Sequence, residues 1–259
     1  MKFTEEQTKS FKEAGYVFIE DLFKAEEIEL MNNEAKAIYD IERPEIVKEK
    51  NGKAIRTVFG AHTFNNIFSK LARHPRIIKP TMQLLDGEVY VHQFKLNAKM
   101  AFDGDVWQWH QDYGTWKNDD DMPEGLALNV GIFLDDVTQF NGPLNFIPKS
   151  HREGYIDASH DTRTTSYPLW TINEETISKL VDRGGIVAPT GKAGSVVFFD
   201  STLVHGSPSN MSPWNRTIVY ISLNRTSNHI RKFNRPEYIA HRDFNPIRCL
   251  NDNCLVENT

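Results

Sequence analysis

The sequence has 259 residues, of which 39% are hydrophobic and 25% are charged, and its formal net charge is −5. These proportions are typical of a soluble globular protein, and the length is enough for one sizeable domain with its own core. A negative net charge without a block of lysines or arginines argues against nucleic acid or an anionic membrane as the main partner. No run approaches the ~20 apolar residues that a membrane-spanning helix needs.

The beginning of the sequence carries acidic residues and no continuous apolar run, so we expect no signal peptide. Cys249 and Cys254 are the two cysteines, and they lie close together in the sequence. A disulfide between them stays open, but two thiols in a chain of this length are more typical of a reducing compartment. They are too few for a zinc knuckle. We therefore expect a cytoplasmic protein.

The first third of the sequence has mainly helical patterns. Apolar residues recur at helical spacing in two stretches, the first of which should end at Gly15. A later helical region is interrupted near His74-Pro75. The predicted elements are a helix at 4–14, a strand at 16–22, a helix at 25–41, a strand at 55–59 and two short helices within 65–85.

From residue 89 onward the patterns change to strands. Short stretches of alternating or continuous apolar residues are separated by turns rich in Gly, Pro, Asn and Asp. The predicted strands are 89–100, 126–134, 144–147, 195–200 and 216–224. We expect only one helix in this half, at about 173–181. Many short strands with few helices indicate a mainly β sandwich or barrel, covered by the N-terminal helices in a single domain.

The strongest chemical signal is His110-Gln111-Asp112, followed far downstream by His205. On an extended segment, residues i and i+2 point to the same side, so His110 and Asp112 can reach one metal ion. His205 follows the apolar strand at 195–200 and can supply a third ligand. Two imidazoles and one carboxylate on one face of an octahedral iron leave three positions for a cosubstrate and dioxygen.

An isolated His-x-Asp motif occurs by chance in many proteins, so it needs support from other residues. Arg216 lies eleven residues after His205, at the start of the next apolar strand. Its planar guanidinium can clamp the far carboxylate of a dicarboxylate, which suits 2-oxoglutarate. Without His205, a surface arginine in a strand would be the better interpretation.

These motifs, in this order, resemble the phytanoyl-CoA dioxygenase family and, within it, the ectoine hydroxylases. The resemblance begins with FKEAGYVFI at 11–19 and covers nearly the whole chain. Its most specific part is WHQDYGTW at 109–116. Further matching pieces are RTVF at 56–59 with His62, VHQFKLNAK at 91–99, DDMP at 120–123, NGPL at 141–144, IPKSH at 147–151, GSVVFFD at 194–200 and HGS at 205–207.

The resemblance implies a double-stranded β-helix, or jelly roll, with N-terminal and flanking helices. In this scheme residues 1–85 are a helix-rich cover, residues 86–226 are the jelly-roll core and residues 227–259 are a C-terminal extension of one oxygenase domain. Within the extension, residues 235–244 are not part of the pattern of ectoine hydroxylases.

The resemblance also implies roles for individual residues. The iron ligands are His110, Asp112 and His205, and Arg216 completes the catalytic set. The residues that hold 2-oxoglutarate are Lys99, Asn97, Asn129, Ser207 and Arg216. The residues that line the substrate pocket are Gln93, Trp116, Phe59 and Tyr220. The sequence departs from the ectoine hydroxylase pattern at Gly114, Asp121, Asn129 and Tyr220.

Several neighbouring residues have two interpretations. Arg56 binds a substrate carboxylate or forms a structural salt bridge. The acidic run 119–121 is a solvated loop or a lid that meets a cationic substrate. The remaining residues are expected to be structural: Trp107 and Trp109 as core aromatics, and His62, His92 and His151 as hydrogen-bonded scaffold groups.

The implied activity is that of an Fe(II)- and 2-oxoglutarate-dependent dioxygenase that uses O2 to hydroxylate an unactivated C–H bond. The expected substrate is a small polar or zwitterionic metabolite: an amino acid, or an ectoine-like or aminophosphonate-like molecule. The alternatives are a tailoring oxygenase of a natural-product intermediate and a non-enzymatic jelly-roll binding protein. Because Asp112 fills the position that chloride takes in related halogenases, we expect hydroxylation and not halogenation. The sequence does not predict the oligomeric state.

Overall fold

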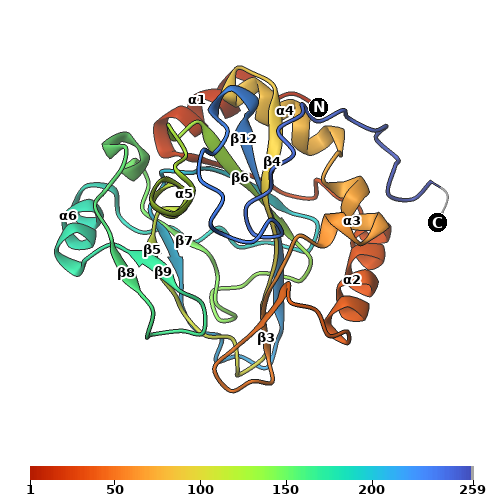
Figure 1. Ribbon diagram of the computed structural model, residues 1–259, viewed down its shortest axis with the longest axis horizontal. Coiled ribbons are helices and arrows are strands. Elements are labelled where there is room, and N and C mark those ends of the chain that lie inside the picture. Colours follow the sequence, from red (N-terminus) through yellow and green to blue (C-terminus); the bar gives the residue numbers. More distant parts are fainter. Residues whose placement is uncertain (258–259) are drawn as a thin grey trace.

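The computed structural model describes residues 1–257 and consists of two antiparallel sheets with helices on their flanks (Figure 1). The strands are β1 (Tyr16–Ile19), β2 (Ile46–Lys48), β3 (Ile55–Phe59), β4 (Val89–Lys99), β5 (Trp107–His110), β6 (Ala127–Phe133), β7 (Asn145–Phe146), β8 (Ser159–Asp161), β9 (Leu169–Thr171), β10 (Val196–Asp200), β11 (His205–Ser207) and β12 (Arg216–Arg225). The major sheet has the order β1-β10-β6-β12-β4-β3-β2, and the minor sheet has the order β5-β11-β7. Strands β8 and β9 form a separate two-stranded ribbon.

Four of the helices cover the outer face of the major sheet: α1 (Glu5–Ala14), α2 (Ala25–Tyr39), α3 (Asn66–Leu71) and α4 (Pro75–Leu85). The other helices are α5 (Asp112–Asp120) and α6 (Glu174–Gly184). Apolar side chains of α1 to α4, such as Phe11, Met31 and Phe68, share one buried cluster with sheet residues such as Leu96 and Val219. Helix α6 lies on the opposite side of the molecule, near β8 and β9 (Figure 1).

The two faces of the major sheet have different side chains because successive residues of a strand point to opposite sides. In β10, Val196 and Phe198 pack in the cluster under the helices, whereas Val197 and Phe199 pack in a second cluster that includes Phe146 of the minor sheet. The second cluster therefore lies between the two sheets. A ligand-binding site inside the jelly roll must therefore be formed by side chains on this inner face of the major sheet.

The predicted fold class, a mainly β jelly roll with N-terminal and flanking helices, is confirmed. The predicted helices and strands of the N-terminal part are present within a few residues of their expected bounds. The predicted end of α1 at Gly15 is confirmed, and this residue has φ +90°. At the other end of the helix, the side chain of Thr4 caps the first turn. A side chain at Gly15 would lie 2.6 Å from the His151 ring, so this position also requires glycine for space.

The expectation of only one helix after residue 89 is wrong, because α5 is a second one. Gln111 is still extended, with φ −113° and ψ 133°, and the helix begins at Asp112. Six residues of this helix are buried, and they include polar as well as apolar side chains. Its sequence, DYGTWKNDD, therefore has no helical spacing of apolar residues from which the helix could be predicted. Five short strands, β2, β5, β8, β9 and β11, were not predicted either.

The C-terminal segment 229–257 packs back onto the molecule without forming a helix or strand. Ile230, Ala240 and Leu255 are buried. The backbone N–H of His241 donates to the carbonyl of His92, on strand β4, at 2.9 Å. This segment therefore runs beside the sheet and over the end of the jelly roll.

Candidate active site

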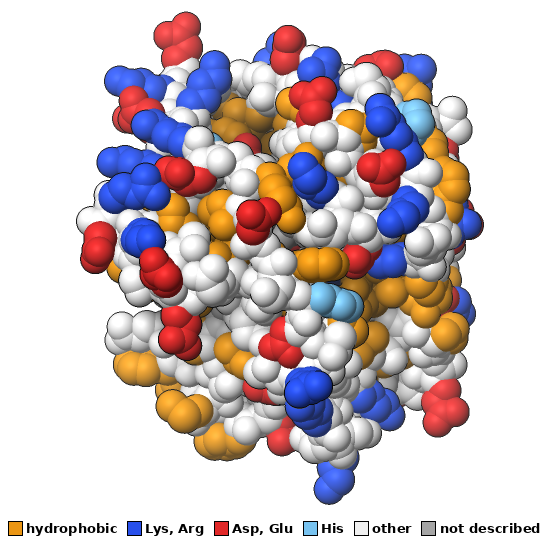
Figure 2. Space-filling view, turned by 60° about the vertical axis from the view of Figure 1, so that its left-hand side comes forward, with side chains coloured by type: hydrophobic (Ala, Val, Ile, Leu, Met, Phe, Trp, Pro, Cys, Tyr) orange, Lys and Arg blue, Asp and Glu red, His pale blue; other side chains and the backbone are white. Residues whose placement is uncertain are grey.

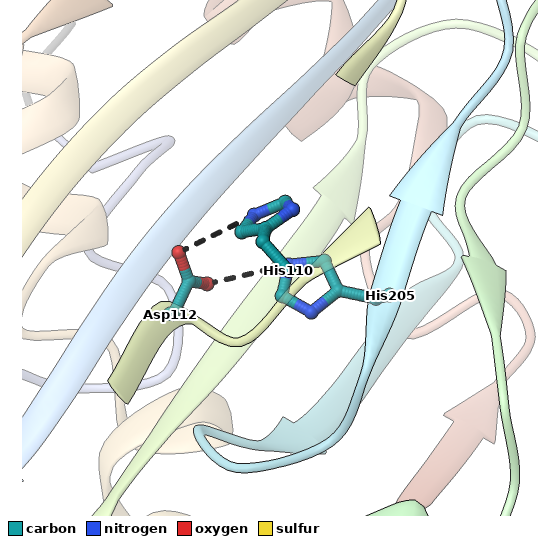
Figure 3. Close-up of side chains that lie close together, drawn as sticks. All are labelled: His110, Asp112 and His205. Atoms are coloured by element: carbon teal, nitrogen blue, oxygen red, sulfur yellow. Dashed lines mark ion pairs between the residues drawn. The ribbon is translucent and has the colours of Figure 1, made fainter. Parts of the chain in front are cut away.

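Three side chains from three elements meet inside the jelly roll (Figure 3). His110 ends β5, Asp112 begins α5, and His205 begins β11. Strands β5 and β11 pair so that His110 and His205 are direct cross-strand partners. The Nε2 atom of His110 lies 3.8 Å from Oδ1 of Asp112, and Nε2 of His205 lies 3.5 Å from Oδ2.

The extended conformation expected for His110-Gln111-Asp112 is present only in part. His110 and Gln111 are extended, whereas Asp112 is the first residue of a helix. Because Gln111 between them is extended, the two side chains still point toward the same space. Gln111 fixes this corner, since its Nε2 donates to the carbonyls of Gly154 at 2.7 Å and Thr202 at 2.5 Å.

Backbone contacts set the tautomers of both histidines. Nδ1 of His110 lies 2.6 Å from the carbonyl of Gln108, and Nδ1 of His205 lies 2.9 Å from the carbonyl of Leu203. A carbonyl can only accept, so each Nδ1 carries the proton and each Nε2 presents a lone pair. Both lone pairs face the Asp112 carboxylate (Figure 3).

This donor set fits a divalent iron. The three candidate ligand atoms lie within 4.8 Å of one another. Three ligands at right angles and about 2.1 Å from a metal ion are about 3 Å apart, so small side-chain adjustments close the site. Two imidazoles and one carboxylate on one face are the donors that non-haem Fe(II) oxygenases use, with open positions on the other face.

Burial and neighbouring charges keep these groups in the protonation states that a metal needs. Burial, with a smaller contribution from His205, lowers the pKa of His110 to about 3. Burial also lowers the pKa of His205. Burial alone would raise the pKa of Asp112, but Lys95 and the two imidazoles lower it to about 2. At neutral pH the site thus has two neutral imidazoles and one carboxylate.

A cavity opens from the His110, Asp112 and His205 side chains, and most of the predicted site residues line it. The predicted residues that line it are Phe59, Gln93, Asn97, Trp116, Ser207, Arg216 and Tyr220, together with the three candidate ligands. They come from both sheets and from α5. Lys99, Asn129 and Arg56 do not line it.

The ammonium of Lys99 binds backbone carbonyls and does not point into the cavity. Its Nζ donates to the carbonyl of Pro208 at 2.8 Å and to that of Asp105. Burial, followed by repulsion from Arg216 and Arg56, holds the pKa of Lys99 well below its usual range. Two of the three N–H groups of the ammonium donate to these carbonyls, and Lys99 does not line the cavity.

Of the two interpretations of Arg56, the structure shows the salt bridge. Its side chain is completely buried, and Nη1 lies 3.0 Å from Oε2 of Glu49. Nη2 donates to the carbonyl of Val106 at 2.8 Å, and the guanidinium lies 3.9 Å above the ring of Trp107. Arg56 therefore supports the wall of the cavity from behind. Trp107, predicted to be a core aromatic, is itself part of that wall.

Other residues that line the cavity were not predicted, and Lys95, Tyr167 and Arg235 are those among them with an ionisable side chain. Lys95 had a sequence signal, because it alternates with Gln93 and Asn97 on one face of β4. Its Nζ lies 3.6 Å from Oδ1 of Asp112. Tyr167 and Arg235 belong to irregular segments, so no periodicity marks them.

Arg235 reaches the cavity from the C-terminal segment and is paired with Asp120. Its Nε donates to Oδ1 of Asp120 at 2.8 Å, and its Nη2 donates to Oδ2. Asp120 is fully buried, so the interpretation of 119–121 as a solvated loop is wrong for this residue. The neighbouring Asp119 accepts a hydrogen bond from Nε1 of Trp170 at 3.0 Å. The acidic run thus anchors two segments over the cavity.

The histidines expected to be scaffold groups lie outside the cavity. His62 stacks on Phe94 and makes an edge contact with His241, with ring centroids 4.9 and 4.5 Å apart. His92 lies 3.4 Å from Asp120. His151 contacts the carbonyl of Lys12 through Nε2 at 3.1 Å, which joins its turn to α1.

A jelly roll with two histidines and an aspartate around a buried cavity is the architecture of a non-haem iron oxygenase. The family model of phytanoyl-CoA dioxygenase matches residues 11–218. An ectoine dioxygenase of Bordetella parapertussis is 36% identical, over 97% of this chain and 87% of its own length. The chain belongs to the phytanoyl-CoA dioxygenase family, as the motifs predicted.

Other relatives extend this comparison. An L-proline trans-4-hydroxylase of Streptomyces griseoviridis is 37% identical, over 80% of this chain and 81% of its own. Among solved structures, EctD from S. alaskensis with 2-oxoglutarate and 5-hydroxyectoine has a TM-score of 0.85 and 33% identity, and covers 96% of this chain and 87% of its own. The same protein with bound Fe matches with the same TM-score.

Proposed function

We propose that this protein is an Fe(II)- and 2-oxoglutarate-dependent dioxygenase that hydroxylates a C–H bond of a small zwitterionic metabolite. The observation that carries the proposal is the meeting of His110, Asp112 and His205 at the base of a cavity that also contains Arg216. Bound iron, with 2-oxoglutarate and O2, supplies an oxidant strong enough to convert an unactivated C–H bond into an alcohol. The protein supplies the binding, the orientation and the exclusion of water.

The dicarboxylate cosubstrate is assigned to the end of the cavity where Arg216 lies. Nε and Nη2 of Arg216 both donate to the carbonyl of Gly142, at 3.1 and 2.5 Å, which fixes the plane of the guanidinium. Its Nη1 makes no hydrogen bond within residues 1–257 and is available for a carboxylate. Ser207 and Asn97 line the same cavity, and Thr57 holds Oδ1 of Asn97 at 2.6 Å so that the amide N–H groups remain for a ligand.

The electrostatics of this end favour an anion. Arg216 and Lys99 are cross-strand partners, and both are almost completely buried. Buried cations without matching carboxylates are unfavourable unless an anion binds nearby. A bound anion would stabilise the charged form of Lys99, whose pKa burial lowers, so we infer that Lys99 acts on 2-oxoglutarate through its charge. Gly142 allows this arrangement, since its φ is +75° and a Cβ there would lie 2.6 Å from Cδ of Lys99.

The other end of the cavity fits a molecule with one carboxylate and one cationic or polar nitrogen group. Arg235 can receive the carboxylate. Aromatic rings surround the remaining space: Phe59 and Tyr167 have ring centroids 5.4 Å apart, and Tyr167 and Trp107 have centroids 5.9 Å apart. Aromatic faces attract cations. Ectoine and L-proline, the compounds in the names of two relatives, are both molecules of this kind and are the first candidates.

The test is a screen of the purified protein with Fe(II), 2-oxoglutarate and single candidates, including ectoine, L-proline and other cyclic or N-alkylated amino acids. Succinate is measured together with the product mass. We expect one candidate to give succinate and a product heavier by one oxygen atom in equal amounts. His205→Ala should abolish both, and the exposed His160→Ala is the matched control. Turnover by His205→Ala at the wild-type rate would refute the assignment.

Supporting observations also bear on partners and location. No helix within residues 1–257 is long and apolar enough to cross a membrane. On the face shown in Figure 2, basic and acidic side chains are interspersed, without a continuous basic area for nucleic acid. Cys249 and Cys254 are both free thiols. We propose a small-molecule enzyme of the cytoplasm that has no nucleic-acid partner.

A further inference from the structure

Behind the Asp112 carboxylate lies a short chain of hydrogen bonds that does not touch the cavity. Asn129 of β6 and Ser222 of β12 are direct cross-strand partners, and both are fully buried. Oγ of Ser222 donates to Oδ1 of Asn129 at 2.6 Å. Nδ2 of Asn129 donates to Oδ2 of Asp112 at 2.9 Å.

This chain of bonds has a direction. The ionised carboxylate of Asp112 can only accept, so the N–H end of the Asn129 amide must face it. Oδ1 of Asn129 then faces β12, where the hydroxyl of Ser222 donates to it. Both heteroatoms of the Asn129 amide are used inside the protein, and the side chain is absent from the lining of the cavity. This placement does not suit a direct contact with 2-oxoglutarate, the role that the resemblance implied for Asn129.

The consequence for Asp112 is a fixed orientation. Its Oδ2 receives the amide N–H of Asn129, while its Oδ1 lies 3.6 Å from the ammonium of Lys95. A carboxylate that is held at both oxygens cannot rotate freely about its Cβ–Cγ bond. It also cannot easily turn to bind a metal with both oxygens, which would occupy a position that the cosubstrate or dioxygen needs.

We propose that Asn129, whose Oδ1 is held by Ser222, is a positioning residue that holds Asp112 as a ligand through one oxygen. The proposal rests on the proposed function, because it concerns the same metal site. Hydrogen-bonded partners of metal ligands typically change metal affinity about 10- to 100-fold when they are removed.

The experiment measures Co(II) and Fe(II) binding to the metal-free protein by anaerobic titration calorimetry, without turnover. We expect Asn129→Ala to weaken binding by about 10- to 100-fold. Ser222→Ala, which keeps the bond from Asn129 to Asp112 but removes the donor to Oδ1 of Asn129, should weaken binding by a smaller factor. Asn32→Ala is the control, because Nδ2 of Asn32 also donates a 2.8 Å hydrogen bond, to the carbonyl of Leu134 outside the site. Thermal unfolding of each variant separates lost metal affinity from lost stability.

A second readout is the visible absorption of the anaerobic Fe(II) protein with 2-oxoglutarate, which reports the geometry around the metal. The band should shift in Asn129→Ala and stay unchanged in Asn32→Ala. Wild-type metal affinity and an unshifted band in both Asn129→Ala and Ser222→Ala would overturn the proposal. A raised KM for 2-oxoglutarate with unchanged metal affinity would also overturn it. If wild type binds the metal but oxidises no candidate substrate, the proposed function fails, while the inference about Asn129 stands.

Discussion

We propose that Arg216 binds the far carboxylate of 2-oxoglutarate. Its Nε and one N–H of Nη2 donate to Gly142, so that Nη1 and the other N–H of Nη2 remain side by side. A lysine ammonium cannot reproduce this planar pair of donors. We predict that Arg216→Lys raises the KM for 2-oxoglutarate at least about tenfold, the effect of losing about 1.4 kcal/mol of binding free energy. Calorimetric affinity for Co(II) should stay near that of wild type. Arg225→Lys, at the other end of β12, is the matched control and should leave both quantities unchanged.

Arg235 is the residue that we propose binds the substrate carboxylate. Arg235→Gln alone leaves Asp120 buried without its cation, so the informative variant is Arg235→Gln combined with Asp120→Asn. We expect a higher KM for a carboxylate substrate, an unchanged KM for 2-oxoglutarate, and little discrimination between the substrate and its carboxamide. Steady-state kinetics with both compounds measures this. A double variant that still prefers the carboxylate as strongly as wild type would place the carboxylate elsewhere.

The sequence predicts the metal-binding residues better than their surroundings for a physical reason. A metal needs a few side chains of fixed chemistry, and the His110-Gln111-Asp112 motif shows them directly. Lys95 and Lys99 alternate on the same face of β4, so the pattern cannot distinguish them. The difference is that the carbonyls of Asp105 and Pro208, from two loops, cover Lys99 and leave Lys95 facing the site.

The C-terminal segment contacts the short helical turn at residues 61–63 through two histidines, His241 and His62, and this contact requires both rings to be neutral. Burial lowers the pKa of His62 to about 4, and burial together with His62 and His92 lowers that of His241 to about 2. Nδ1 of His62 and Nε2 of His241 have no hydrogen-bond partner within residues 1–257. Protonation of either ring would therefore put an unpaired charge into this contact.

The direction of the pH dependence follows from proton binding. Both rings have a lower pKa in the folded protein than the ordinary value of 6.5, so the unfolded chain binds more protons as pH falls. The free energy of unfolding should be highest above pH 6.5 and should fall from there towards pH 4. We predict that His241→Phe, which keeps an aromatic ring against His62, makes this fall shallower in denaturant titrations. A slope equal to that of wild type would contradict the prediction, and the exposed His160→Phe is the control.

Regular elements were predictable, whereas the segments that close the cavity were not. Strand β12 has a continuous apolar run, and α1 has both a capping residue and a terminal glycine. By contrast, Tyr167 and Arg235 are placed by single contacts with residues far away in the sequence, such as Phe59 and Asp120. Such contacts leave no periodic pattern of apolar residues in the sequence, so a single sequence does not predict them.

At the scale of the whole molecule, Arg76 of α4 joins the beginning and the end of the described chain. Its Nη1 lies 2.8 Å from Oε2 of Glu27 and also donates to the carbonyl of Leu22. Its Nε and Nη2 donate to the carboxylate of Asp252, at 2.9 and 3.1 Å. The helical cover and the C-terminal segment are thus tied together at one guanidinium. We propose that residues 1–259 fold as one domain, which requires that these parts unfold together.

The test of this proposal is Arg76→Met. Glu27 is 2% exposed, so removing its partner leaves an uncompensated buried carboxylate, which typically costs about 3–5 kcal/mol. We predict a loss of this size in the free energy of unfolding, still in a single transition seen equally by circular dichroism and by tryptophan fluorescence. Adding Glu27→Gln should recover part of the loss, because the buried charge is then gone. Arg43→Met is the matched control: its pair with Glu45 is partly exposed at 37% and 11%, and solvent-screened pairs of this kind contribute little to stability. Two separate transitions in Arg76→Met would show that the helical cover and the jelly roll are independent units, and the one-domain interpretation would be wrong.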